Sequence, residues 1–197
     1  IQIMEDLRNS ETGCPWDKEQ TFETIAQYTI EEAYEVAEAI KKNDQVALKE
    51  ELGDLLFQVV FYAQMSKENG GFDFNDIADQ ITEKMIRRHP HVFEKSKTGT
   101  AEMQTVAWEN QKAQERLDRN DASGALDGVA LALPALIRAQ KLQKRAARIG
   151  FDWTKIRPVI DKIKEELDEV TEALQNPENK DHITEEIGDL LFACVNL

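Results

Sequence analysis

The chain has 197 residues, of which 41% are hydrophobic and 31% charged, so it can bury the core of one large domain or two small ones. Its 24 Lys and Arg stand against 38 Asp and Glu, a formal net charge of −14. This balance argues against binding to nucleic acid or to an anionic membrane, because both need clustered positive charge. A phosphate-bearing substrate remains compatible if divalent cations lie between it and the acidic side chains.

The two cysteines, Cys14 and Cys194, are far apart and have no metal-ligand spacing. A disulfide framework is therefore not expected, and a reducing cytoplasm is the natural compartment. No signal peptide is visible, and the most apolar stretch, residues 126–137, is too short to cross a bilayer. We therefore expect a cytoplasmic protein with no membrane partner.

Apolar residues recur at helical spacing in most of the chain and predict an all-α fold. In the first half, two helices over residues 25–40 and 52–60 are separated by Asn43-Asp44. A third helix is expected from Phe74 to His89, where Pro90 ends it. Residues 94–105 suggest an exposed loop, and residues 106–118 a further helix.

The second half begins with a linker, best marked over residues 120–128, and a helix over residues 133–148. We expect an N-terminal unit of residues 1–119, a linker of residues 120–132 and a C-terminal unit of residues 133–197. The chain stops eight residues after Asp189, inside a predicted helix. The second unit is therefore expected to be incomplete, and the sequence to be a fragment of a longer protein.

The two halves repeat one another. Residues 31–40, EEAYEVAEAI, match residues 165–174, EELDEVTEAL, at six of ten positions. Residues 50–62, EELGDLLFQVVFY, match residues 185–197, EEIGDLLFACVNL, at eight of thirteen. A general likeness between acidic amphipathic helices does not explain the shared Gly-Asp-Leu-Leu-Phe. We infer a duplicated pair of helices.

The repeated helices bring carboxylates together. Residues three apart lie on one face of a helix, and in an antiparallel hairpin residues equidistant from the turn lie at one height. Each hairpin therefore gathers four carboxylates about one midpoint, which is residue 43 in the first copy and 177.5, beside Pro177, in the second. The predicted layers are Glu32, Glu35, Glu51 and Asp54, and Glu166, Glu169, Glu186 and Asp189.

Four clustered carboxylates repel one another unless cations neutralise them. Oxygen ligands alone favour Mg²⁺, with Mn²⁺ as a substitute, over zinc. A di-iron site of the ferritin type needs Glu-x-x-His on a helix, and none of the three histidines has a Glu three residues before it. The other interpretation is that the acids coat a solvated helix face, which the recurrence of the pattern disfavours.

At these residues the chain resembles the MazG family of all-α nucleoside triphosphate pyrophosphatases, whose signature is EExxE followed by ExxD. The signature stands at residues 31–35 with 51–54, and at 165–169 with 186–189. The resemblance covers essentially the whole chain and extends to residues 14–17 (CPWD), 87–93 (RRHPHVF) and 150–153 (GFDW). It implies two tandem MazG-like helical units that resemble a four-helix bundle.

The resemblance also implies Mg²⁺-dependent hydrolysis of nucleoside triphosphates to monophosphate and pyrophosphate, with broad base tolerance. It implies catalytic roles for Glu32, Glu35, Glu166 and Glu169, and nucleotide contacts from Lys162, Glu165, Glu185, Lys84, Arg88 and Trp108. Trp108 can equally be a packing anchor, and Arg88 can lie at a solvated helix end. The C-terminal copy is usually taken as the active one in two-domain members, but no third helix follows its hairpin in this sequence. Either the sequence is a fragment of a longer protein, which we favour, or the second site is incompetent.

Two functions from different classes follow. The first is the enzyme, expected to be a homodimer because short helical hairpins expose apolar faces that a partner covers. The alternative is a helical binding or regulatory module that holds a nucleotide or a protein partner without turning it over. Identifying the products formed from a nucleoside triphosphate and Mg²⁺ separates the two.

Overall fold

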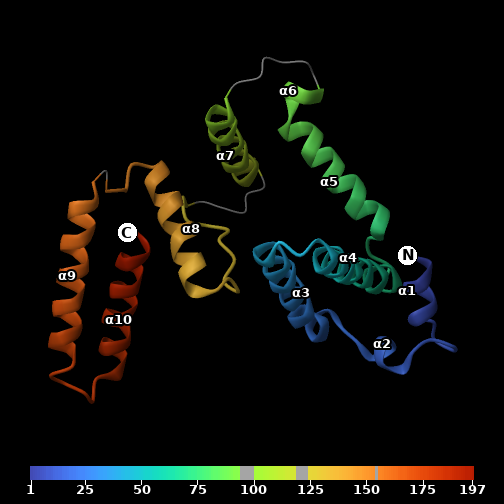
Figure 1. The fold of residues 1–197 in the computed structure, drawn as a ribbon, viewed down its shortest axis with the longest axis horizontal. Coiled ribbons are helices and arrows are strands. Elements are labelled where there is room, and N and C mark those ends of the chain that lie inside the picture. The colour runs from blue at the N-terminus through green and yellow to red at the C-terminus, as the bar shows by residue number, and fades with distance from the viewer. Residues whose placement is uncertain (94–99, 119–123, 154) are drawn as a thin grey trace. The chain divides into compact units, whose positions relative to one another are not determined.

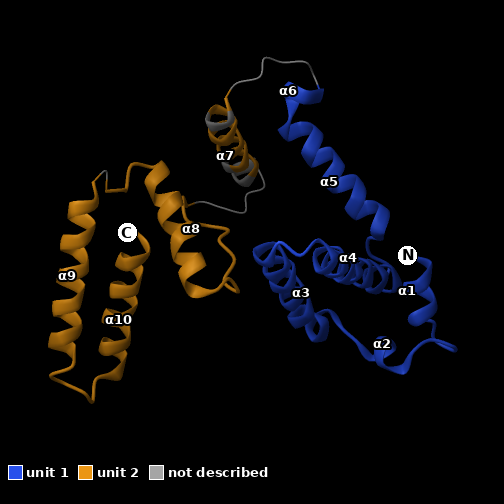
Figure 2. Cartoon of the chain, viewed as in Figure 1, with its two compact units in different colours: residues 1–99 blue, residues 100–197 orange. Residues whose placement is uncertain are grey.

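The computed structural model describes residues 1–93, 100–118, 124–153 and 155–197. Every regular element within these ranges is an α-helix, so the predicted all-α class is confirmed (Figure 1). Internal contacts divide the chain into two compact units, residues 1–99 and residues 100–197 (Figure 2). The domain limits expected from the sequence, at residues 119 and 132, stay a prediction.

The first unit is built on one long helical hairpin. Its helices are α1 (Gln2–Leu7), α2 (Pro15–Glu19), α3 (Phe22–Lys42), α4 (Gln45–Glu68), α5 (Phe74–Arg88) and α6 (Pro90–Phe93). Helices α3 and α4 pack along each other, and α1 and α5 pack against α4. Helix α5 ends where the sequence predicted, immediately before His89 and Pro90.

Local sequence fixes the ends of this hairpin. The Thr21 hydroxyl accepts a hydrogen bond from the backbone N–H of Thr24 and so caps the start of α3. Asn43 ends α3 in the left-handed conformation, with φ 56°, which Asn adopts more readily than most residues. The Asp44 carboxylate accepts from the N–H groups of Val46 and Ala47 and starts α4. The turn therefore lies at the predicted midpoint.

The N-terminal segment is fastened to α4 by a small core and by one arginine. Met4, Ile25, Phe61 and Met65 form the fully buried cluster. The Arg8 guanidinium donates to both oxygens of the Glu68 carboxylate, with the Nη2 contact at 2.7 Å. Arg8 also donates to the carbonyls of Asp17 and Gln20 and lies over the ring of Phe61. These contacts hold α1 and α2 beside the hairpin.

The second unit contains the second copy of the hairpin. Its helices are α7 (Ala101–Asp118), α8 (Ala135–Arg148), α9 (Ile156–Ala173) and α10 (Lys180–Val195). Helices α9 and α10 pack along each other, and α8 packs on α10. The side-chain amide of Gln143 on α8 donates to the carbonyl of Phe192 on α10, at 2.6 Å. Helix α9 begins 134 residues after α3, the same interval that separates Glu166 from Glu32.

The prediction of a loop over residues 94–105 is wrong for the last part of that range. Helix α7 already begins at Ala101, and residues 94–99 lie outside the described ranges. The Thr100 hydroxyl accepts from the N–H of Met103 at 3.3 Å, which is the hydrogen bond of an N-terminal cap. A threonine read as a loop residue therefore starts the helix. Residues 119–123 of the expected linker also lie outside the described ranges.

No helix in the described part of the chain combines the length and the apolar character that crossing a membrane requires.

Candidate functional site

The first hairpin gathers carboxylates from both of its helices. Glu32 and Glu35 on α3 and Glu51 on α4 each place a carboxylate oxygen within 4.8 Å of the others. Asp54, the fourth predicted member, lies outside this trio. It is one helical turn beyond Glu51, and its charge acts on both Glu32 and Glu51. The first layer is therefore a trio with one neighbouring carboxylate.

Repulsion within this layer contributes to raised pKa values for two of its carboxylates, Glu32 and Glu51. Burial, followed by the charges of Asp54 and Glu35, raises the pKa of Glu32 above its ordinary value. Burial and then the charge of Glu35 raise the pKa of Glu51. Clustered carboxylates without a cation behave in this way, because each ionisation disfavours the next. A cation bound at the first layer would therefore relieve the repulsion among its carboxylates.

The second hairpin repeats the arrangement with a different outlying member. Glu166 on α9 and Glu186 and Asp189 on α10 bring their oxygens within 4.8 Å of one another. Glu169 lies outside this trio, and burial followed by the charge of Glu166 raises its pKa. Glu166 is buried, and its Oε2 has no hydrogen-bond partner among the described residues. An ionised oxygen in that position needs a cation.

Two basic side chains touch the second layer. The Lys162 ammonium lies 2.6 Å from Glu166 Oε1 and 2.7 Å from Glu165 Oε1. Hydrogen bonds to Glu165 and Glu166 raise the pKa of Lys162 further above its already high ordinary value, so it carries its charge at neutral pH. His182 Nδ1 lies 3.3 Å from Glu186 Oε1. Sequence reasoning missed the His182 contact, although its spacing of four residues from Glu186 on one helix could have indicated it.

The first layer has different residues at these two positions. Tyr28 stands four residues before Glu32, where the second copy has Lys162, and Ala47 stands four residues before Glu51, where the second copy has His182. Neither side chain can supply a positive charge at neutral pH. The Tyr28 ring instead packs edge-on against Trp16, with the ring centroids 6.2 Å apart. The two layers therefore share their acids but not their surroundings.

The donor set of each layer fits a hard divalent cation. Oxygens on opposite sides of a Mg²⁺ ion are about 4.2 Å apart, twice the usual Mg–O distance. The oxygens of each trio lie within 4.8 Å of one another, so rotation of the side chains can bring them to one ion. The buried, unpartnered Glu166 Oε2 is an oxygen that such an ion would satisfy.

The predicted nucleotide-binding residues lie on four helices. Lys84 and Arg88 are half-buried on one face of α5 in the first unit. Trp108 is half-buried on α7, which its contacts place in the second unit. Glu165 and Glu185 are exposed beside the second layer, and only Glu165 contacts Lys162. The structure thus brings Lys162 and Glu165 to the carboxylates and leaves the roles of the other four as predictions.

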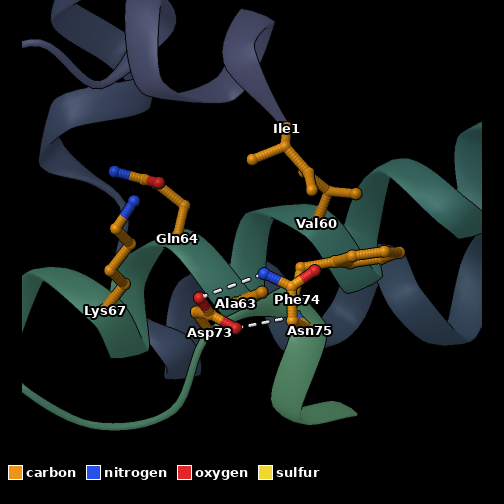
Figure 3. A pocket seen from close by; sticks show the side chains of 8 residues that line it. All are labelled: Ile1, Val60, Ala63, Gln64, Lys67, Asp73, Phe74 and Asn75. Atoms are coloured by element: carbon orange, nitrogen blue, oxygen red, sulfur yellow. Dashed lines mark hydrogen bonds between the residues drawn. The ribbon is translucent and has the colours of Figure 1, made fainter. Parts of the chain in front are cut away.

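A small pocket of the first unit is lined by residues of α4, of the start of α5 and of the N-terminus (Figure 3). Its α4 residues follow Asp54 along the helix, and its Asp73 carboxylate caps α5 by accepting from Asn75 and Asp76. The pocket is therefore part of the α4–α5 corner and not of a carboxylate layer. It is lined by Ile1, Val60, Ala63, Gln64, Lys67, Asp73, Phe74 and Asn75.

Comparison with known proteins agrees with this geometry. The model of the MazG nucleotide pyrophosphohydrolase domain matches residues 20–93 and 156–197, which include both hairpins. The chain is 56% identical to a nucleoside triphosphate pyrophosphohydrolase of Escherichia coli K12, over all of this chain and 75% of that protein. It is 45% identical to a nucleoside triphosphate pyrophosphohydrolase/pyrophosphatase of Thermotoga maritima, over all of this chain and 73% of that protein.

A nucleoside triphosphate pyrophosphohydrolase of Mycobacterium tuberculosis is 36% identical over 77% of this chain and 45% of its own length. The family model covers more than half of the chain, and both carboxylate hairpins fall within it. The chain therefore belongs to the MazG nucleotide pyrophosphohydrolase family.

Proposed function

We propose that the protein hydrolyses nucleoside triphosphates to nucleoside monophosphate and pyrophosphate, depends on Mg²⁺ and tolerates different bases. The observation that carries the proposal is the pair of carboxylate trios, each with its oxygens within 4.8 Å. Family membership and the names of the relatives support the same activity. The alternative is a module that holds nucleotide without turnover, and it does not account for the presence of two acid layers.

The charge of the substrate explains why the site needs a cation. A triphosphate brings about four negative charges toward a layer that is itself acidic, and the two repel each other unless a cation lies between them. Bound Mg²⁺ supplies a Lewis acid for the phosphoryl oxygens and lowers the pKa of water. In the second layer Glu166, Glu186 and Asp189 would hold it, and in the first Glu32, Glu35 and Glu51 with Asp54 beside them. Mn²⁺ is the expected substitute.

The second layer also offers a proton acceptor. Glu169 lies outside the metal-holding trio, on the same face of α9 as Glu166 and one turn beyond it. Because it is not one of the trio, its carboxylate is available to accept a proton. We propose that Glu169 accepts the proton of the attacking water, with Glu166 beside it. Glu35 and Glu32 are the equivalent pair of the first layer.

Positive charge for the phosphates comes from nearby basic residues. Lys162 lies at the edge of the second layer, and its ammonium can stabilise charge that develops on phosphoryl oxygens. Lys84 and Arg88 are the proposed counterparts on α5, and Trp108 the proposed stacking surface for a base. Glu165 and Glu185 complete the proposed nucleotide contacts beside the second layer.

The surface of both hairpins suggests a partner. Large apolar side chains are exposed at matching positions of the two copies, which favours burial against a second chain. We propose a homodimer in which these faces are covered. Two free cysteines fit a reducing cytoplasm as the proposed location. The apolar positions are Leu52, Leu56 and Phe57 on α4 and Ile187, Leu191 and Phe192 on α10.

Phosphorus-31 NMR of the protein with Mg²⁺ and a nucleoside triphosphate tests the activity. Monophosphate and pyrophosphate should accumulate in equal amounts, and EDTA should abolish the reaction. Release of orthophosphate and diphosphate would contradict the proposed bond cleavage. Binding of the triphosphate without any product would favour the non-catalytic module.

A further inference from the structure

Lys162 contacts the buried carboxylate of the second layer from the edge of that layer. Its ammonium lies 2.6 Å from Oε1 of Glu166, whose side chain is only 6% exposed. The other oxygen, Oε2, is buried and without a hydrogen-bond partner among the described residues. The ammonium therefore places a positive charge directly against a buried carboxylate group.

The contact is not a passive surface pair. The Lys162 side chain remains 33% exposed, so the ammonium can leave Glu166 for solvent without unpacking the helix. Its second contact, at 2.7 Å, is to Glu165, whose side chain is 58% exposed. The lysine therefore bridges a buried acid of the layer and an acid at its rim.

A divalent ion on the trio and an ammonium on Glu166 are poorly compatible. Two cations that share one carboxylate repel each other, and more strongly when that carboxylate is as buried as Glu166. The first copy has a matching helical hairpin without this competition, because Tyr28 stands in the position of Lys162. The chain thus contains a layer with a resident cation and a matching layer with a neutral phenol.

We propose that Lys162 is a stand-in cation for the second layer, which holds Glu166 before metal binds and is displaced when a divalent ion arrives. Displacement sends the ammonium toward the rim, where triphosphate oxygens accept its hydrogen bonds. Metal binding therefore precedes tight nucleotide binding at this layer. The inference rests on the proposed metal site and adds to it an order of binding.

Calorimetric titration with Mn²⁺, without nucleotide, tests the exchange. The parent protein carries Glu51→Gln, which removes a ligand of the first layer, so that the second layer is measured alone. Adding Lys162→Met should tighten Mn²⁺ binding on the order of tenfold, because one charge-assisted hydrogen bond no longer has to be broken. Lys162→Arg keeps the charge and should leave the affinity near that of the parent.

Two matched variants control for charge alone. Lys164→Met removes the same charge two residues away, where the ammonium lies 4.0 Å from Asp161 and does not touch Glu166, and should change the affinity little. Tyr28→Lys in a protein that carries Glu186→Gln places an ammonium beside Glu32 and should weaken Mn²⁺ binding to the first layer. Circular dichroism checks that each variant keeps its helices.

The outcomes separate this inference from the proposed function. If the Glu51→Gln parent binds Mn²⁺ but Lys162→Met binds it equally or more weakly, the exchange is overturned and the metal site stands. If the parent binds no Mn²⁺, the second metal site is overturned and the exchange falls with it. Tighter binding by Lys162→Met but not by Lys164→Met supports the stand-in role.

Discussion

The two hairpins of this chain have the same acids in different electrostatic surroundings. In the first, the positions four residues before Glu32 and Glu51 hold Tyr28 and Ala47, which are not basic. The pKa values of Glu32 and Glu51 are raised. In the second, Lys162 and His182 contact members of the trio. The difference lies in the residues four positions before each ligand pair and not in the ligands themselves.

A duplicated site can thus diverge in its surroundings while it keeps its ligands. The first layer has no such basic contact on its own hairpin, and its proposed phosphate contacts, Lys84 and Arg88, lie on α5. A layer with Lys162 binds metal against a competitor and, once filled, has an ammonium for the substrate. We therefore propose that the second layer contributes more to catalysis than the first.

The largest expected effect is on catalysis. Glu166→Gln should lower kcat for triphosphate hydrolysis about 100-fold or more, because it weakens the metal site and the neighbouring proton acceptor together. Glu32→Gln should lower it less than about tenfold, a difference that a coupled pyrophosphate assay resolves. Glu172→Gln, an exposed acid on α9 outside the layer, is the control. A larger loss in Glu32→Gln would reverse the assignment of the two copies.

A second effect concerns how the first hairpin is braced. Arg8→Met should destabilise the first unit by about 2–3 kcal/mol, because it strips a mostly buried guanidinium (9% exposed) from Glu68, which is itself 34% exposed and so partly screened. Urea unfolding followed by circular dichroism measures this loss. Arg157→Met breaks an exposed pair with Asp161 and should cost less than about 0.5 kcal/mol. Equal losses in the two variants would mean that Arg8 is not a brace.

A smaller effect is a pH dependence of the first layer. The pKa of Glu32 is raised above 4.5, so the folded state holds this proton more tightly than the unfolded chain does. As pH rises from about 4.5 toward neutrality, the folded state must ionise Glu32 against its neighbours and loses stability. In EDTA, the melting temperature of Glu32→Gln minus that of the wild type should therefore increase as pH rises over this range.

The control for the pH effect is Glu38→Gln, which removes an exposed acid paired with Lys42 on the same helix. Its melting temperature should show no such gain as pH rises. A flat difference between Glu32→Gln and the wild type would show that the first layer is not under electrostatic strain.

Much of this arrangement is readable from the sequence, and the reasons are physical. Helical periodicity and the Asn43-Asp44 break fix the turn, and the turn fixes which carboxylates lie at one height. The sequence could not show that Asp54 and Glu169 lie outside their trios, because side-chain rotamers decide differences of a few ångströms. It also could not distinguish Thr100 as a cap from Thr100 as a loop residue, since threonine favours both.

The most direct test of the central claim is a count of bound Mn²⁺ by electron paramagnetic resonance on the wild-type chain. Two classes of saturable sites are predicted, of which Glu51→Gln removes one and Glu186→Gln the other. Asp79→Asn, an exposed acid on α5, should remove neither. Unchanged Mn²⁺ binding in both ligand variants, or an equal loss in Asp79→Asn, would contradict the claim that each hairpin carries its own metal site.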